Sequence, residues 1–172
     1  MLVPMNYCQV DIGLYRSGCP SPENLAFLRT LKLRTVISLL SHDEGKGPQI
    51  SEKVLEFYKQ EGIKLIEYDF GKGNRHHLHF IDKETCRMAL MDLLNPELYP
   101  IMVHCKKGKH RTGSLIGLYR KLHNWSCSNI FHEYCLFEPK DKSRVEDERF
   151  IEQYDVSGIK CVASESTSLD TI

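Results

Sequence analysis

The ten residues from His104 to Gly113 read His-Cys-Lys-Lys-Gly-Lys-His-Arg-Thr-Gly and combine a potential nucleophile with potential anion ligands. Cys105 and Arg111 lie six positions apart, so a short loop can turn its backbone N–H groups, a guanidinium and a sulfur toward one point. A tetrahedral oxyanion would fill that point, with amides around its oxygens, Arg111 holding two of them, and the sulfur in line with phosphorus. The pattern predicts a cysteine-dependent phosphatase in which Cys105 and Arg111 are catalytic. We call residues 105–111 the cysteine loop.

The thiol of Cys105 must be ionised near neutral pH in order to attack phosphorus. A free thiol titrates near ~8.5, and a helix N-terminus with nearby cations lowers this to ~3.5–7.5. From Ser114 onward, apolar residues recur with a helical period, which predicts a helix whose positive end faces the loop. Residues 104–111 also hold four fixed positive charges and no acid. We therefore expect Cys105 to be a thiolate.

The remaining residues of the segment are candidates for substrate binding. Gly108 and Gly113 allow a tight turn and a close approach of the backbone to a ligand. Thr112 can donate its hydroxyl to the sulfur, and His104 can fix the loop from behind. The expected substrate ligands in this segment are Lys106, Lys107, Gly108, Lys109, His110, Thr112 and Gly113.

Short apolar strands alternate with helical patterns along the chain. This alternation predicts a single α/β domain over residues 1–160, a three-layer α/β/α sandwich with a mainly parallel sheet. The loop would lie at the carboxyl end of a strand, where open α/β sheets bind ligands. Residues 161–172 are expected to form a flexible tail. The expected elements are a hairpin at 7–17, a helix from Ser21 with Pro22 at its first position, strands at 35–40, 64–70 and 101–104, and helices at 51–60, 82–94, 126–137 and 143–154.

The cysteine loop resembles that of the protein tyrosine and dual-specificity phosphatases. The wider chain is more similar to the plant and fungal atypical dual-specificity phosphatases, whose loop usually reads His-Cys-x-x-Gly-Lys-His-Arg-Thr-Gly. The resemblance implies a protein tyrosine phosphatase-like fold and hydrolysis of inositol pyrophosphates besides generic phosphatase substrates. Further matching segments are Gly13-Leu14-Tyr15-Arg16-Ser17-Gly18, residues 22–40, 73–75, 87–90, 130–134 and 149–150.

The general acid is left open by the sequence. The resemblance implies an acid on a loop after the preceding strand, where Asp69 is the only carboxylate but lies within the strand pattern. His76 and His77 can act as acids near neutral pH, yet they depart from the Gly-Asn-Lys-Glu-Pro pattern of the resembling proteins. Gly73, Asn74 and Arg75 fit that pattern, and Arg75 is a further candidate for substrate binding. The alternatives for the general acid are thus Asp69, His76, His77 or no residue.

Leaving-group chemistry favours phosphoanhydrides if no acid is well placed. A phosphate leaving group has a second pKa near ~6, against ~10 for the phenol of tyrosine. The lysines around the loop also suit a densely phosphorylated small molecule. The sequence thus predicts hydrolysis of the outer phosphate of inositol pyrophosphates through a phosphocysteine intermediate. Two alternatives stay open: a protein tyrosine or dual-specificity phosphatase, and a non-catalytic phosphate-binding or scaffold module.

Composition indicates the compartment and the partners to expect for this enzyme. The formal net charge of the 172 residues is zero, so nucleic acid is not an expected partner. The seven cysteines show no disulfide or metal-site spacing, which indicates a reducing compartment. No signal peptide and no stretch of ~20 apolar residues is seen, so we expect a cytoplasmic enzyme without membrane insertion, metal or cofactor. We also expect Arg16, Lys72, Arg75 and Arg144 to extend the basic surface around the loop.

Overall fold

The structure is a computed structural model that describes residues 1–40, 50–70, 82–137 and 144–159. Five strands form one sheet in the order β1-β2-β5-β3-β4, in which only β1 is antiparallel to its neighbour. The strands are β1 (Cys8–Asp11), β2 (Leu14–Gly18), β3 (Thr35–Ser38), β4 (Lys64–Glu67) and β5 (Ile101–Cys105). The helices are α1 (Leu25–Thr30), α2 (Glu52–Gln60), α3 (Lys83–Leu93), α4 (His110–Leu122), α5 (Cys127–Phe137) and α6 (Arg144–Gln153), with 3-10 turns at Pro22–Asn24 and Pro96–Leu98.

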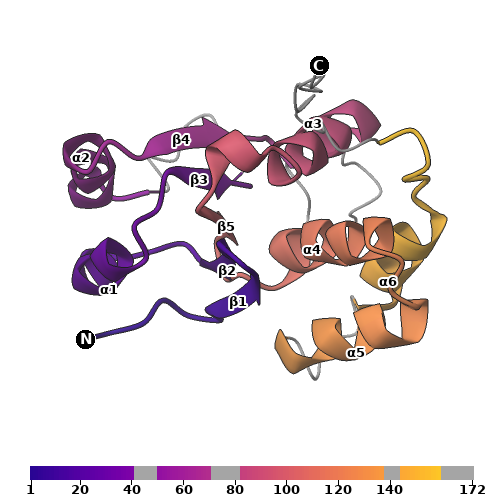
Figure 1. Cartoon of the computed structure of the whole chain (residues 1–172). Helices are drawn as coiled ribbons and strands as arrows, with labels where there is room; N and C mark the ends of the chain where they lie inside the picture. Colours follow the sequence, from indigo (N-terminus) through magenta and orange to yellow (C-terminus); the bar gives the residue numbers. More distant parts are fainter. Residues whose placement is uncertain (41–49, 71–81, 138–143, 160–172) are drawn as a thin grey trace, which may run out of the picture.

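The sheet is covered by helices on both faces. Figure 1 shows α1 and α2 on one side of the strands and α3, α4, α5 and α6 on the other. The expected three-layer α/β/α sandwich with a mainly parallel sheet is confirmed. Crossover helices on both faces bury a parallel sheet, which explains why its strands read as continuous apolar runs.

Strand β5 lies at the centre of the sheet, between β2 and β3. Its side chains alternate between the two faces, because successive residues of a strand point to opposite sides. Ile101, Val103 and Cys105 belong to the core under α3–α6, whereas Met102 belongs to the core under α1 and α2. The strand is thus fixed on both faces, and its last residue is the cysteine of the loop.

Two expected boundaries next to the site were wrong. Helix α4 begins at His110 and not at Ser114, so Arg111 and Thr112 lie in its first turn. Strand β4 ends at Glu67, so Asp69 follows the strand and does not lie within it. In both cases the spacing of apolar residues indicated the right type of element. The polar first turn of α4 and the polar residue after β4 interrupt that spacing, so it does not indicate where the element begins or ends.

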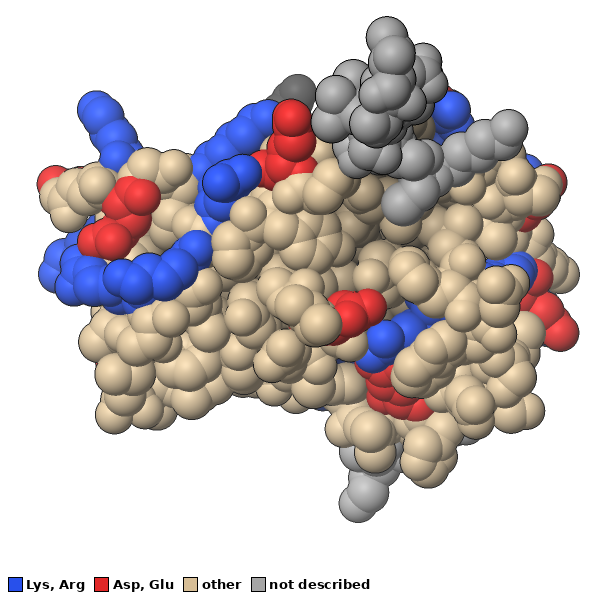
Figure 2. Space-filling model, viewed as in Figure 1, with Lys and Arg blue, Asp and Glu red and all other residues tan. Residues whose placement is uncertain are grey.

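Charges of both signs are mixed on the surface. On the face in Figure 2, Lys and Arg side chains lie beside Asp and Glu side chains, in keeping with a net charge of zero. Arg29 and Glu61, for example, form an ion pair with an N–O distance of 2.9 Å. Within the described ranges, no helix has both the length and the hydropathy required to cross a bilayer.

Candidate active site

Cys105 lies where β5 ends and the turn into α4 begins. Cys105 is the last residue of the strand and is only 5% exposed. Helix α4 starts at His110, so four residues separate the strand from the helix. The first N–H groups of a helix have no partner within it and carry partial positive charge. Strand, turn and helix therefore direct a cysteine and a helix N-terminus toward the same place.

Arg111 is anchored to the neighbouring strand. Its Nη1 atom donates a hydrogen bond to the carbonyl oxygen of Leu39, at 3.1 Å, just beyond the end of β3. Since β3 pairs with β5 up to Ser38 and His104, this bond brings the guanidinium to the carboxyl edge of the sheet, where Cys105 lies. A planar guanidinium can hold two oxygens of an oxyanion at once. The structure thus brings the two predicted catalytic residues to the same edge.

The predicted lysine ligands Lys106, Lys107 and Lys109 lie within the cysteine loop, and we call these three residues the lysine rim. Lys106 and Lys107 are exposed, Lys109 is half-buried, and Gly108 between them is buried. Exposed ammonium groups on long stems can adjust to the phosphates of a large substrate. Contact of these lysines with substrate stays a prediction.

His110 faces the helices that flank the loop. Its Nδ1 atom lies 2.8 Å from Oδ2 of Asp147 in α6 and 3.1 Å from the hydroxyl of Tyr134 in α5. The hydroxyl of Tyr134 also donates to Oδ2 of Asp147. These contacts hold the first residue of α4 against both helices. The imidazole therefore positions the loop, and its expected contact with substrate stays a prediction.

Thr112 and Gly113 lie in the first turn of α4 and are both buried. The Thr112 hydroxyl has no hydrogen-bond partner among the described residues, so the expected bond to the sulfur is not formed here. The N–H of Gly113 donates to the carbonyl of Lys109 at 2.7 Å. A Cβ at Gly113 would lie 2.6 Å from the ring of Tyr134, so this glycine allows α4 to pack against α5. Substrate contacts by either residue stay predictions.

His104 precedes the cysteine and is completely buried. Burial lowers the pKa of its imidazole to about 4, against a smaller opposing effect of the Cys105 backbone. The ring is therefore neutral at physiological pH and adds no charge behind the loop. The expected role of His104 in fixing the loop from behind stays a prediction.

The candidate acids lie only partly within the described residues. Asp69 is exposed and follows β4, after Tyr68, whose backbone N–H donates to the carbonyl of Ser38 at 2.9 Å. This bond continues β4 along β3 and brings Asp69 to the carboxyl edge of the sheet. Lys72, Arg75, His76 and His77 lie outside the part of the chain that the structure describes.

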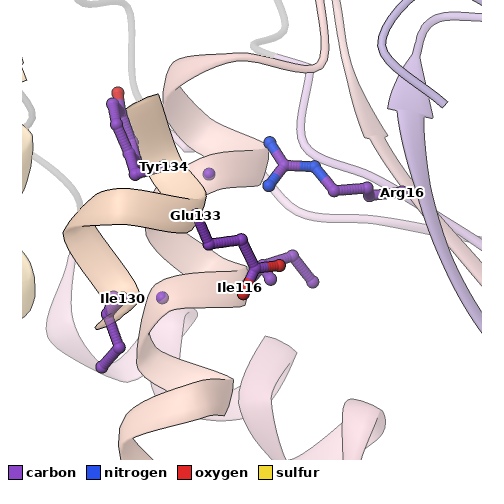
Figure 3. Close-up of a pocket in the computed structure, with 7 residues that line it drawn as sticks. Arg16, Ile116, Ile130, Glu133 and Tyr134 are labelled. Atoms are coloured by element: carbon purple, nitrogen blue, oxygen red, sulfur yellow. The ribbon is translucent and has the colours of Figure 1, made fainter. Parts of the chain in front are cut away.

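Arg16 was expected at the basic surface, and this expectation was wrong. The residue is 1% exposed, and its Nη2 atom donates to the carbonyl oxygen of Gly108 at 2.9 Å. Figure 3 shows the side chain extending from β2 toward Glu133 and Tyr134 of α5. Arg16 and Asp147 are thus the site residues that sequence reasoning missed. Asp147 had a signal, because it shares an apolar helical face with Phe150, Ile151 and Tyr154.

No group of three or more His, Cys, Asp or Glu side chains with the geometry of a metal site is found among the residues described. The cysteines at 8, 19, 86, 105, 127 and 135 are free thiols. The site therefore consists of a thiol, a guanidinium, a helix N-terminus and a rim of lysines. This fold and site define an α/β protein of the protein tyrosine phosphatase class.

Comparison with known proteins agrees with this class. Residues 1–170 match the profile described as "Tyrosine phosphatase family", and the chain belongs to that family and is a phosphatase. Inositol diphosphatase DSP4 of Arabidopsis thaliana is 38% identical over 157 residues, which cover 91% of this chain and 75% of that protein. Inositol diphosphatase SIW14 of Saccharomyces cerevisiae is 39% identical over 170 residues, which cover 98% of this chain and 58% of SIW14. The expected similarity to plant and fungal phosphatases is confirmed.

Solved structures give the same result for the fold. The core catalytic domain of the PP-IP phosphatase SIW14 from S. cerevisiae, in complex with citrate, matches with a TM-score of 0.78 and 40% identity, over 90% of this chain and 88% of that one. TpbA of P. aeruginosa matches with a TM-score of 0.68 and 21% identity, over 90% of this chain and 88% of that one. The second likeness concerns the fold alone.

Proposed function

We propose that this phosphatase hydrolyses the outer phosphate of inositol pyrophosphates through a phosphocysteine intermediate on Cys105. The observation that carries the proposal is that Cys105 ends β5 while Arg111 bonds to Leu39 just beyond β3, at the same edge of the sheet. The plant and yeast relatives support it, because they are named inositol diphosphatases.

In the first step, the thiolate of Cys105 attacks the terminal phosphorus. A sulfur–phosphorus bond forms, the bond to the bridging oxygen breaks, and the electron pair leaves with the inositol polyphosphate. N–H groups at the start of α4 and the guanidinium of Arg111 bind the equatorial oxygens, where negative charge must be held during the transfer. In the second step, water attacks phosphorus and releases inorganic phosphate, and the sulfur departs as the thiolate.

The leaving group explains how the reaction proceeds with little acid catalysis. A departing phosphate has a second pKa near ~6 and is a stable anion without added protons. Asp69, exposed at the carboxyl edge of the sheet, is the described residue best placed to assist a poorer leaving group. Phosphoanhydrides should therefore be cleaved fastest, aryl phosphates more slowly and alkyl phosphates slowest.

The lysine rim supplies the substrate preference. Lys106 and Lys107 are exposed next to the site, and Lys109 is half-buried beside them. An inositol pyrophosphate carries further phosphates around its ring that these ammonium groups can reach, whereas a phosphotyrosine side chain presents only one. Each exposed charge pair contributes about 0.2–1 kcal/mol.

The decisive experiment compares inositol pyrophosphates, phosphotyrosine peptides, phosphoinositides and para-nitrophenyl phosphate on one enzyme preparation. We expect the highest kcat/KM for the inositol pyrophosphate. Replacing Lys106, Lys107 and Lys109 by Gln should then lower that kcat/KM by about ten- to a hundredfold and affect the aryl phosphate much less. The matched control replaces Lys53, Lys59 and Lys64, which are exposed on α2 and β4.

Two outcomes would contradict the proposal. A preference for the phosphotyrosine peptide would indicate a protein phosphatase. Equal losses on both substrates in the lysine variant, with the control unchanged, would show that the lysines support the loop and do not select the substrate. Raising the ionic strength gives an independent check, since screening weakens exposed contacts with a multivalent anion most.

A further inference from the structure

Three successive carbonyl groups of the cysteine loop are bonded to the N-terminal part of the chain. The backbone N–H of Cys19 donates to the carbonyl of Lys106 at 3.2 Å. The side-chain amide of Asn6 donates to the carbonyl of Lys107 at 2.9 Å. The guanidinium of Arg16 donates to the carbonyl of Gly108, also at 2.9 Å. The loop is thus held by three donors from residues 6–19.

These bonds determine which way the loop amides point. In a planar trans peptide, the C=O of one residue and the N–H of the next point to opposite sides. Because the carbonyls of residues 106–108 face the N-terminal segment, the N–H groups of residues 107–109 face away from it. Successive N–H groups that converge on one side form an anion-binding concavity. The donors behind the loop therefore hold its amides ready for the oxyanion.

Gly108 shows how closely the loop lies on the end of β2. Its φ is +70°, and a Cβ there would lie 2.5 Å from the Gly18 nitrogen and 2.6 Å from the Ser17 carbonyl oxygen. Gly18 is also the register partner of Cys105. The residues that follow Arg16 thus contact the loop at its turn and at its nucleophile.

Arg16 adds a buried positive charge to this support. The residue is 1% exposed, and its guanidinium stacks on the ring of Phe137 at 3.6 Å from the centroid. Burial lowers the pKa of Arg16 to about 10, while Glu133 and then Cys105 act to raise it, so the group stays charged at neutral pH. Glu133 is already paired with Arg120 at 2.8 Å, so the Arg16 charge is only partly neutralised. Figure 3 shows Glu133 and Tyr134 on the helix that the guanidinium faces.

We infer that Arg16 is a positioning residue of the phosphatase: it fixes the loop carbonyl at Gly108 and stabilises the Cys105 thiolate from behind, with Asn6 completing the support at Lys107. Arg111 approaches the site from the β3 side, through Leu39, whereas Arg16 approaches from β2. The two arginines thus have separate tasks. Arg111 contacts the oxyanion, and Arg16 holds the loop that receives it. This inference rests on the proposed role of Cys105 as nucleophile.

The test measures the rate at which iodoacetamide alkylates Cys105 at several pH values, read at that residue by peptide mass spectrometry. Arg16→Met should lower the fraction of Cys105 present as thiolate, because an opposite charge that favours the thiolate is removed. Alkylation at pH 6 should then be about tenfold slower. Arg16→Lys keeps the charge and a donor and should restore most of the wild-type rate.

The matched control is Arg34→Met. Arg34 also donates to a backbone carbonyl, that of Glu97 at 2.8 Å, but this contact lies at the turn before β5 and not at the cysteine loop. The control should leave alkylation of Cys105 unchanged. All rates are measured at least 10 °C below each variant's melting temperature, so that loss of fold is not read as loss of reactivity.

Asn6→Asp tests the loop support without touching the buried arginine. Asn6 has a φ of +53°, which Asp also tolerates, but a carboxylate cannot donate to the Lys107 carbonyl. Protection of Cys105 by inorganic phosphate should require about three- to tenfold more phosphate in this variant. If Arg16→Met fails to fold, the Asn6→Asp and Arg16→Lys variants still test whether Asn6 and Arg16 support the loop.

The possible results separate this inference from the proposed mechanism. Wild-type Cys105 that reacts at pH 6 no faster than an unfolded-peptide cysteine would overturn the proposed nucleophile. An activated wild-type thiol, with Arg16→Met and Asn6→Asp both behaving like Arg34→Met, would overturn the role of Arg16 and Asn6 alone. If Arg16→Met slows the alkylation of Cys105 and Arg16→Lys does not restore the rate, the electrostatic part of the inference is overturned.

Discussion

The Nδ1 atom of His110 lies 2.8 Å from Oδ2 of Asp147, 37 positions further along the chain. The Asp147 side chain is 3% exposed, and the carboxylate also accepts a hydrogen bond from Tyr134. A single buried carboxylate therefore joins the first turn of α4 to α5 and α6. Since α4 begins directly after the loop, this contact fixes the angle at which its N-terminus meets the oxyanion.

Asp147→Asn should destabilise the protein and slow turnover. The substitution keeps the shape but removes the charge that two donors share, and hydrogen bonds to charged groups contribute about 1.5–3 kcal/mol. We expect a loss of that order in the free energy of unfolding, measured by urea denaturation, together with a lower kcat. Glu152→Gln on the same helix is the control, because its side chain is exposed. Equal urea midpoints for Asp147→Asn and Glu152→Gln would show that the contact has no energetic role.

Gly108→Ala should abolish most activity, and Gly62→Ala provides the comparison. Both glycines have a positive φ, +70° and +67°, so both substitutions introduce similar backbone strain. A Cβ at Gly62 has open space, whereas one at Gly108 would meet the Gly18 nitrogen at 2.5 Å. Gly62→Ala should cost about 1 kcal/mol and keep kcat. Gly108→Ala should shift the loop and lower kcat/KM by well over tenfold. Similar kinetics for the two variants would mean that the loop tolerates displacement from β2.

His104 should make stability fall on mild acidification. Its folded-state pKa is lowered to about 4 by burial, while an unfolded histidine titrates near ~6.5. Below pH 6.5 the unfolded chain takes up a proton that the folded protein does not, so the free energy of unfolding decreases between pH 6.5 and 4. The difference is on the order of 3 kcal/mol and is complete below pH 4.

The measurement for His104 is a series of urea denaturations from pH 7.5 to 4.5 on the wild type and His104→Gln. Glutamine does not titrate, so the variant should lose stability less steeply across this range. Parallel curves for the two proteins would show that the imidazole of His104 does not contribute to the acid dependence.

Cys105→Ser should eliminate turnover and leave substrate binding intact. An alcohol is a much weaker nucleophile than a thiolate, and the loop amides and Arg111 are unchanged. Isothermal titration with the inositol substrate and a phosphate-release assay measure the two properties separately. Turnover near the wild-type level would disprove the phosphocysteine intermediate.

Arg111→Lys should lose most of its activity although the positive charge is kept. The planar guanidinium, which donates to Leu39 at 3.1 Å, can hold two oxygens of an oxyanion at once, whereas an ammonium lacks this two-point grip. We expect kcat/KM to fall by about a hundredfold or more, since a preorganised donor to a developing oxyanion contributes about 10²–10³ in rate. Arg29→Lys, at an exposed ion pair, is the control. Wild-type kinetics in Arg111→Lys would remove Arg111 from the catalytic residues.

The local pattern was sufficient for the order of elements and for the choice of a candidate nucleophile. Periodicity predicted strands at 35–40 and 101–104 and a helix at 51–60, where the structure has β3, β5 and α2, because apolar residues repeat with the period of the buried face. The spacing of Cys105 and Arg111 indicated an anion-binding loop for a related reason. A loop that curls around one anion must carry its ligands within a few residues.

The pairing of β2 with β5 could not be predicted from the sequence. The hairpin pattern at residues 7–17 indicates only that β1 and β2 run antiparallel, and nothing in it tells that Gly18 will lie beside Cys105. Parallel pairing across many residues depends on how all the strands share one core. The buried position of Arg16 follows from that pairing, which is why a basic residue in a short strand was expected at the surface.

The sequence by itself thus determined the chemistry proposed for the loop, since the proposed nucleophile, the arginine and the lysines are neighbours along the chain. Only the tertiary structure decided what holds that loop: Asn6, Arg16 and Cys19 on one side, Leu39 on another, and Asp147 with Tyr134 behind the helix. The physical reason is that carbonyl groups and buried charges are satisfied by whatever the fold brings within hydrogen-bond distance. Those partners come from segments distant in sequence, and no spacing within the chain identifies them.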